Sequence, residues 1–172
     1  MQLFEGTKHF LYNKKVKMIE LFNKSWVISL ETNSKNKITF DTSNLEVKID
    51  DLNVVHPGEF EKSWILLEVK EYSEKLFYSF TVDSKHIVII TDDSFPLKEE
   101  ILSFFWDVDV LIIKWSKESA VIFENIEARV VLPYWDNKST FFTTLWQHPE
   151  EGSSYKIKWE LSIDSTEFIN IA

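Results

Sequence analysis

Two adjacent carboxylates, Asp92 and Asp93, directly follow the apolar run His86–Thr91. Carboxylates at the end of a strand could hold a hard cation such as Mg²⁺ or Ca²⁺, because these ions prefer oxygen ligands. The same pair also suits a simpler role, since an aspartate before a helix accepts hydrogen bonds from the free N–H groups of its first turn. That second interpretation predicts that the pair caps a helix starting from Leu97, and the sequence leaves both open.

The other residue types that commonly do chemistry form no recognisable constellation. None of the four histidines lies two or four positions from another: His9, His56, His86 and His148. We expect His56 to belong to a turn, His86 to pack in a strand and His148 to be exposed. The absence of cysteine excludes disulfides and thiolate metal sites. The three glycines lie far apart, which excludes phosphate-cradling loops, and there is no G-x-S-x-G nucleophile elbow.

Length and charge narrow the class of protein. At 172 residues the chain is expected to form one domain, with residues 1–15 as a lead-in. A net charge of −9 argues against nucleic acid and anionic membrane surfaces as partners. No apolar run approaches the ~20 residues of a membrane span, and the first residues lack an apolar signal core. Together with the missing cysteines, these features predict a cytoplasmic protein.

The segment Lys85 to Tyr134 must position the carboxylates, and it predicts a strand–helix–strand–helix–strand unit. Three apolar runs supply its strands: His86–Thr91, Asp109–Ile113 and Ala128–Pro133. Continuous apolar runs separated by helices are typical of parallel strands covered on both faces. The inner positions of the two helices are expected to be Leu97, Ile101, Leu102 and Phe105 in the first and Ala120, Val121, Phe123 and Ile126 in the second. Ligands of such sheets bind at the loops after the strands.

The rest of the chain is predicted to be rich in strands. Alternating or β-branched runs before the central unit are Val16–Leu21, Trp26–Thr32, Lys37–Asp41, Leu45–Ile49, Trp64–Val69 and Phe77–Val82. His56–Glu61 is expected to be a turn, because proline fixes φ and glycine permits a left-handed conformation. Ser139–Leu145 is expected to be helical, and Tyr155–Leu161 and Glu167–Ile171 to be strands. This order predicts two sheets packed face to face with helices outside.

Three segments in this order resemble the metallo-β-lactamase fold, in its branch of small lactonase-like zinc-dependent hydrolases. PGEFE at Pro57–Glu61 is similar to a PGEYE turn of that branch, and DVDVLI at Asp107–Ile112 to its DVDVLLIP strand. RVVLP at Arg129–Pro133 is similar to the strand that precedes its late histidine. The resemblance covers Val16 to Ile171 and implies an α/β fold: a four-layer αβ/βα sandwich, here shortened.

The resemblance implies a two-metal site that this chain largely lacks. The family takes its ligands from an HxHxDH loop, a mid-chain histidine, a bridging aspartate and a late histidine. Here Leu45–Asn53 and Lys70–Glu74 contain no histidine, and the late histidine falls on Trp135. Only Asp92, at the bridging position, remains as a metal ligand, and one carboxylate cannot hold a catalytic metal. The site mouth implied by the resemblance consists of Asp41, Asp92, Asp93, Trp135 and Asp136.

We therefore expect a degenerate, non-catalytic member of this fold that acts as a binding or assembly module, with no catalytic residues and no cofactor. A homo-oligomer or a protein partner is expected, and Trp135, Phe141, Phe142 and Trp146 could form an apolar patch for it. One alternative is a metal-dependent hydrolase of phosphoester or lactone type, using zinc or another divalent metal at Asp92 and Asp136. Another is a small-molecule binder with a cleft over Asp92 and Trp135.

The numbers of tryptophan and glycine suggest one further hypothesis. The chain has 7 tryptophans and only 3 glycines, whereas average glycine usage of ~7% would give about a dozen. Trp64 and Trp106 fall where the resembling branch has glycine, and Trp26 and Trp135 also lie at predicted turns. The hypothesis is that the native gene reads UGA as glycine and that the printed translation reads it as tryptophan.

Overall fold

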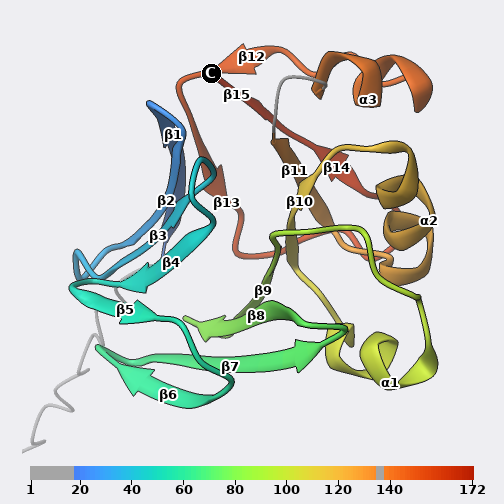
Figure 1. Ribbon diagram of the computed structural model, residues 1–172. Coiled ribbons are helices and arrows are strands. Elements are labelled where there is room, and N and C mark those ends of the chain that lie inside the picture. Colours follow the sequence, from blue (N-terminus) through green and yellow to red (C-terminus); the bar gives the residue numbers. More distant parts are fainter. Residues whose placement is uncertain (1–17, 135–137) are drawn as a thin grey trace, which may run out of the picture.

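A computed structural model describes residues 18–134 and 138–172, which form two large β-sheets with helices against one of them (Figure 1). One sheet has six strands in the order β13-β1-β2-β3-β4-β5. The other has seven, in the order β14-β11-β10-β9-β8-β7-β6. A short pair joins β12 (Glu151–Gly152) to β15 (Asn170–Ile171).

The six-stranded sheet is antiparallel throughout and has one face buried. Its strands are β1 (Ile19–Lys24), β2 (Val27–Thr32), β3 (Lys37–Asp41), β4 (Glu46–Ile49), β5 (Leu52–Val54) and β13 (Ser154–Ile157). In β3 the buried residues Ile38 and Phe40 alternate with residues that are half exposed. Alternation of this kind is what one buried face requires, and β3 has the bounds that the sequence predicts.

The seven-stranded sheet is mixed. An antiparallel meander contains β6 (Gly58–Lys62), β7 (Ile65–Tyr72), β8 (Lys75–Val82) and β9 (Lys85–Ile90). From β9 onward the strands run parallel through β10 (Val110–Lys114), β11 (Val130–Tyr134) and β14 (Glu167–Phe168). The predicted parallel strands of the central unit are therefore confirmed. The predicted turn at His56–Glu61 is wrong in its second half, because Gly58–Lys62 pairs with β7 as an edge strand.

Helices cover the outer face of the seven-stranded sheet. They are α1 (Glu99–Leu102) with a following 3₁₀ turn (Ser103–Phe105), α2 (Lys117–Ile126) and α3 (Lys138–Thr144). The inward face of α2 differs from the prediction, because Val121 is 54% exposed and Ile122 is buried. Ser116 caps this helix, and its N–H bonds to Ser119 Oγ. That cap fixes where the helix starts, and the buried residues Ser119, Ile122 and Ile126 lie on one face at helical spacing.

The described residues form three layers, helices on sheet on sheet. The helices lie on one side of the molecule in Figure 1, and within the described ranges none covers the outer face of the six-stranded sheet. The fourth layer of the predicted αβ/βα sandwich is thus not seen there. The reason lies in the sequence, because the chain from β1 to β9 passes from strand to strand with no helical segment between them.

The core between the two sheets carries most of the packing. Phe40 from the six-stranded sheet meets Tyr134 from the seven-stranded sheet edge to face, with ring centroids 5.1 Å apart. Both side chains belong to one continuous apolar cluster that includes residues of both sheets. Burial of aromatic side chains dominates core energetics, so this contact joins the sheets at the end where β3 and β11 finish.

Replacing Phe40 should therefore destabilise the protein strongly. We expect Phe40→Ala to lower the free energy of unfolding by about 3–5 kcal/mol, because it leaves a cavity between the sheets. Leu66→Ala is the matched control, since Leu66 is 50% exposed on β7 and should cost under about 1 kcal/mol. Urea denaturation followed by circular dichroism measures both, and equal losses would contradict the described core.

Candidate functional site

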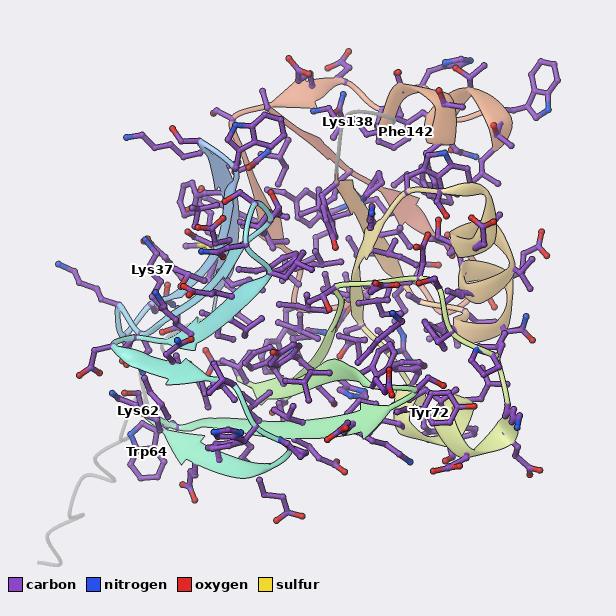
Figure 2. The ribbon with its side chains drawn as sticks, in the orientation of Figure 1. Lys37, Lys62, Trp64, Tyr72, Lys138 and Phe142 are labelled. Carbon is purple, nitrogen blue, oxygen red and sulfur yellow. The ribbon has the colours of Figure 1, made fainter. Side chains whose placement is uncertain are left out.

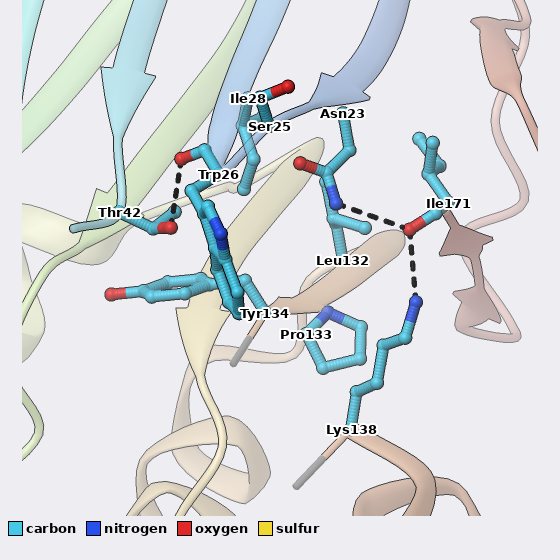
Figure 3. A pocket seen from close by; sticks show the side chains of 10 residues that line it. All are labelled: Asn23, Ser25, Trp26, Ile28, Thr42, Leu132, Pro133, Tyr134, Lys138 and Ile171. Atoms are coloured by element: carbon cyan, nitrogen blue, oxygen red, sulfur yellow. Dashed lines mark hydrogen bonds between the residues drawn. The ribbon is translucent and has the colours of Figure 1, made fainter. Parts of the chain in front are cut away.

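A cavity of about 460 Å³ opens at one end of the molecule and is lined by both sheets (Figure 3). The β1–β2 turn, the end of β3, the end of β11, the start of α3 and β15 form its wall. Its lining residues are Asn23, Ser25, Trp26, Ile28, Thr42, Leu132, Pro133, Tyr134, Lys138 and Ile171. The described lining thus contains no histidine, aspartate or glutamate, and most of its side chains are apolar or neutral.

Hydrogen bonds hold the rim of this cavity in place. Thr42 donates its hydroxyl and its backbone N–H to the carbonyl of Trp26, each at 2.9 Å. On the other side, Asn23 Nδ2 and Lys138 Nζ both donate to the carbonyl of Ile171, at 3.4 and 3.1 Å (Figure 3). Lys138 is the cationic group of the lining, and Glu151 lies 3.6 Å from its ammonium. An ammonium has three donors, so Lys138 keeps donor capacity toward the cavity.

Tyr134 links the cavity to the loop after β9. Its hydroxyl donates to the carbonyls of Ile90 and Thr91, at 3.1 and 3.2 Å. Burial raises the pKa of Tyr134 far above its ordinary value, and the negative charges of Asp93 and Asp92 raise it further. The phenol therefore stays protonated, and its hydroxyl is committed to the backbone. Tyr134 acts as a rigid wall of the cavity.

The predicted metal ligand Asp92 has its oxygens satisfied by neighbouring residues. Oδ1 accepts hydrogen bonds from the N–H and the hydroxyl of Ser94, at 2.8 and 2.6 Å, and Oδ2 accepts from Lys75 Nζ at 3.1 Å. Burial raises the pKa of Asp92, but the bonds from Ser94 and Lys75 outweigh it and hold that pKa below its ordinary value. The carboxylate is therefore charged, and Ser94 and Lys75 supply its hydrogen-bond donors.

Asp93 is buried and ties two elements together. It is 8% exposed and accepts a hydrogen bond from the hydroxyl of Ser116, the residue that caps α2. The expected cap of a helix starting from Leu97 is wrong, because α1 is preceded by Lys98 and has no side-chain cap. Asp93 instead supports the start of α2, which is the next helix along the chain.

The remaining predicted site residues are placed as follows. Asp41, at the end of β3, accepts from the N–H and the hydroxyl of Ser43 at 2.9 and 2.6 Å, and the hydroxyl bond lowers its pKa. Trp135 and Asp136 lie outside the described residues, as does His9. Within residues 18–134 and 138–172, no group of three or more histidine, cysteine, aspartate or glutamate side chains could hold a metal ion. Asp41, Asp92 and Asp93 therefore do not form such a group, and the described residues do not fit a zinc site.

The segment that should carry the HxHxDH loop explains part of this absence. Leu45–Asn53 forms most of the β4–β5 hairpin of the six-stranded sheet, in which Val47 and Ile49 are buried. A hairpin in the sheet has no projecting loop for ligands. The apolar patch expected for a partner is also not formed as predicted, because Phe141 and Phe142 are buried and only Trp146 is exposed among the described members.

A serine and a histidine that the sequence did not single out together form a close pair. Ser79 Oγ lies 2.6 Å from His86 Nε2, and His86 Nδ1 lies 3.1 Å from the carbonyl of Asp107. The period-two pattern of β8 and β9 could have placed both side chains on the outer face of the sheet. Because β8 and β9 pair along their whole length, the surrounding N–H groups are committed to the sheet. The pair therefore lacks the free donors that an acyl-transfer site needs.

Comparison with known proteins agrees with the architecture. The chain superposes on a candidate Zn-dependent hydrolase of the metallo-β-lactamase superfamily from Thermotoga maritima, with a TM-score of 0.68 and 13% sequence identity. The superposition covers 90% of this chain and 98% of that one. The chain has the metallo-β-lactamase fold.

In this fold the cavity lies at the edge where the two sheets meet. A sequence identity of 13% shows a shared fold and does not show a shared function. No protein-family profile and no curated protein sequence matches the chain. In the described part of the chain, no helix has the length and apolar character needed to cross a membrane.

The contacts of Asp92 predict a pH-dependent stability. A lowered pKa in the folded state means that the charged carboxylate stabilises the fold above pH ~4, and that this contribution is lost as pH falls through the folded pKa. We expect Asp92→Asn to lower the free energy of unfolding by about 1 kcal/mol at pH 7. The difference should shrink below pH ~4.

Asp164→Asn is the control for this measurement, since Asp164 is exposed. Thermal unfolding of the three proteins between acid and neutral pH provides the comparison. A loss for Asp92→Asn that stays constant across that range would show that the charge of Asp92 contributes nothing.

Proposed function

We propose that this chain is a cytoplasmic, non-catalytic binding module that uses a shortened metallo-β-lactamase fold to hold a small ligand at the edge of its two sheets. The observation that carries the proposal is the composition of the cavity wall. Both sheets contribute to it, and its described residues offer a cation and neutral donors in place of metal-binding side chains. A catalytic zinc requires three protein ligands and an open position, and the described residues of this wall do not supply them.

The wall also suggests the chemistry of the ligand. Ile28, Leu132 and Pro133 provide an apolar surface, and Lys138 at the start of α3 provides positive charge. Pockets of this kind bind the apolar body of a ligand and use a few polar groups to orient it. The class that fits is a small apolar molecule with a carboxylate or sulfonate end that reaches Lys138.

The alternative function, a metal-dependent hydrolase, requires a bound metal ion. A phosphoester or lactone hydrolase would need a bound zinc or other divalent ion to lower the pKa of a water, with Asp92 and Asp136 among its ligands. The carboxylate of Asp92 is engaged by Ser94 and Lys75, which disfavours that arrangement.

The expected homo-oligomer or protein partner stays a prediction, and light scattering tests it. Glu59, Glu61 and Lys62 place charges along the edge strand β6. Charged residues on an edge disfavour sheet-to-sheet association, so we do not expect an oligomer to form through this strand.

Anilinonaphthalene sulfonate, an anion with a large apolar aromatic body, is a suitable probe for this cavity. We expect saturable binding by fluorescence titration and about tenfold weaker binding to Lys138→Met, because the sulfonate loses its charged donor. Lys156→Met is the matched control, since Lys156 is exposed on β13 and should leave the affinity unchanged. Thermal unfolding verifies that both variants are folded.

Two results would contradict the proposal. Equal affinity for the probe in Lys138→Met and Lys156→Met would show that the cavity does not take the anion. Hydrolysis of a phosphodiester or lactone substrate by the protein loaded with Zn²⁺ or Mn²⁺ would support the hydrolase alternative.

A further inference from the structure

Three tryptophans adopt a backbone conformation that bulky residues rarely accept. Trp26, Trp64 and Trp146 have φ angles of 70°, 64° and 55°. In this left-handed region the β-carbon of an L-residue crowds the following carbonyl, at a cost of roughly 1–2 kcal/mol per residue. Glycine has no β-carbon and adopts the region freely. Each of the three positions is therefore one where glycine is the favoured residue.

Two of these positions are the second residue of a two-residue hairpin turn. Ser25-Trp26 joins β1 to β2, and Ser63-Trp64 joins β6 to β7, with the flanking residues paired directly across each turn. Both residues of each turn have positive φ, which is the pattern of a type I′ turn. This turn strongly prefers glycine at its second position, after Asn, Asp or Gly.

The third position ends a helix in the manner of a Schellman motif. After α3, the N–H of Trp146 donates to the carbonyl of Thr143 at 3.2 Å, and the N–H of Gln147 donates to the carbonyl of Phe142 at 2.8 Å. These are the two bonds that define the motif, and its left-handed residue is most often glycine. Trp146 occupies that left-handed position.

The side chains bury little area that would offset this backbone cost. Trp26 is 57% exposed, and Trp64 and Trp146 are each 87% exposed; Trp64 projects from the β6–β7 turn in Figure 2. Tryptophan stabilises a protein through the large area that it buries. Trp115, which is 5% exposed and packs on Phe141 with ring centroids 4.3 Å apart, shows the usual case.

We propose that positions 26, 64 and 146 are specified by UGA codons that the native translation reads as glycine. One reassigned codon accounts at once for the excess of tryptophan, the shortage of glycine and the location of these residues at glycine-type turns. Trp106 does not share the backbone feature, because its φ is −74°. With glycine at position 26, the cavity at the sheet edge would lose its indole wall and become wider.

The decisive experiment combines the gene sequence with mass spectrometry of the protein from its native cells. Trypsin places each of the three residues in its own peptide: residues 25–35, 63–70 and 139–156. We expect UGA at the three codons, and peptides lighter by the difference between a tryptophan and a glycine residue. The peptide 49–62, which contains Gly58, is the internal control. UGG at these codons, or native peptides with the tryptophan mass, would overturn the proposal.

The structural premise can be tested separately with recombinant protein of the printed sequence. Trp64→Gly should raise the equilibrium constant for folding by about 5–30-fold, because it relieves the left-handed strain. Trp106→Gly is the matched control, since Trp106 is 79% exposed but has negative φ, and it should give no gain. Equal effects of the two substitutions would remove the backbone argument.

Discussion

The fold depends on a set of tight turns that determine how its strands pair. Four two-residue hairpins, at β1–β2, β6–β7, β7–β8 and β8–β9, have positive φ at both central residues. A shift of one residue in any of them would move every apolar side chain of a strand to the opposite face. The turns therefore keep inward residues of these strands, such as Leu21, Ile28 and Phe80, in the layer between the sheets, and Ile28 of that layer lines the edge cavity. This is why the residue type at these turns matters beyond the turns themselves.

The scaffold and the metal chemistry of this fold are physically separable. The inter-sheet packing involves alternating apolar residues on strands, whereas the metal ligands of the resembling family lie on loops. In this chain most of Leu45–Asn53 forms a hairpin, and Asp92 and Asp93 accept hydrogen bonds from Ser94, Lys75 and Ser116. The residues that hold the two sheets together are thus distinct from the described carboxylates, and the proposed ligand site uses the recess at the edge of the sheets.

The sequence predicts the strands well where its pattern is strong. The alternation of β3 and the continuous apolar runs of β9, β10 and β11 are confirmed, including the parallel pairing. It fails where local and tertiary signals compete. Pro57-Gly58 indicates a turn, yet Gly58–Lys62 pairs with β7 as an edge strand. On α2 the buried residues Ser119, Ile122 and Ile126 lie on one face at helical spacing, so Ile122 and not Val121 faces the sheet.

The candidate site was harder to predict, because its contacts join distant residues. Asp93 and Ser116 are 23 positions apart, and Asn23 and Ile171 are 148 apart, so no local pattern reveals them. The resemblance directed attention to carboxylates, whereas the described cavity wall is made of apolar residues, neutral donors and Lys138.

The central claim is that the edge cavity is a ligand site without a catalytic metal. Anomalous diffraction at the zinc absorption edge, from crystals grown with Zn²⁺, tests it most directly. The account predicts no zinc peak in the cavity or beside Asp92. A zinc ion held there by Asp92 together with other side chains of the chain would contradict it.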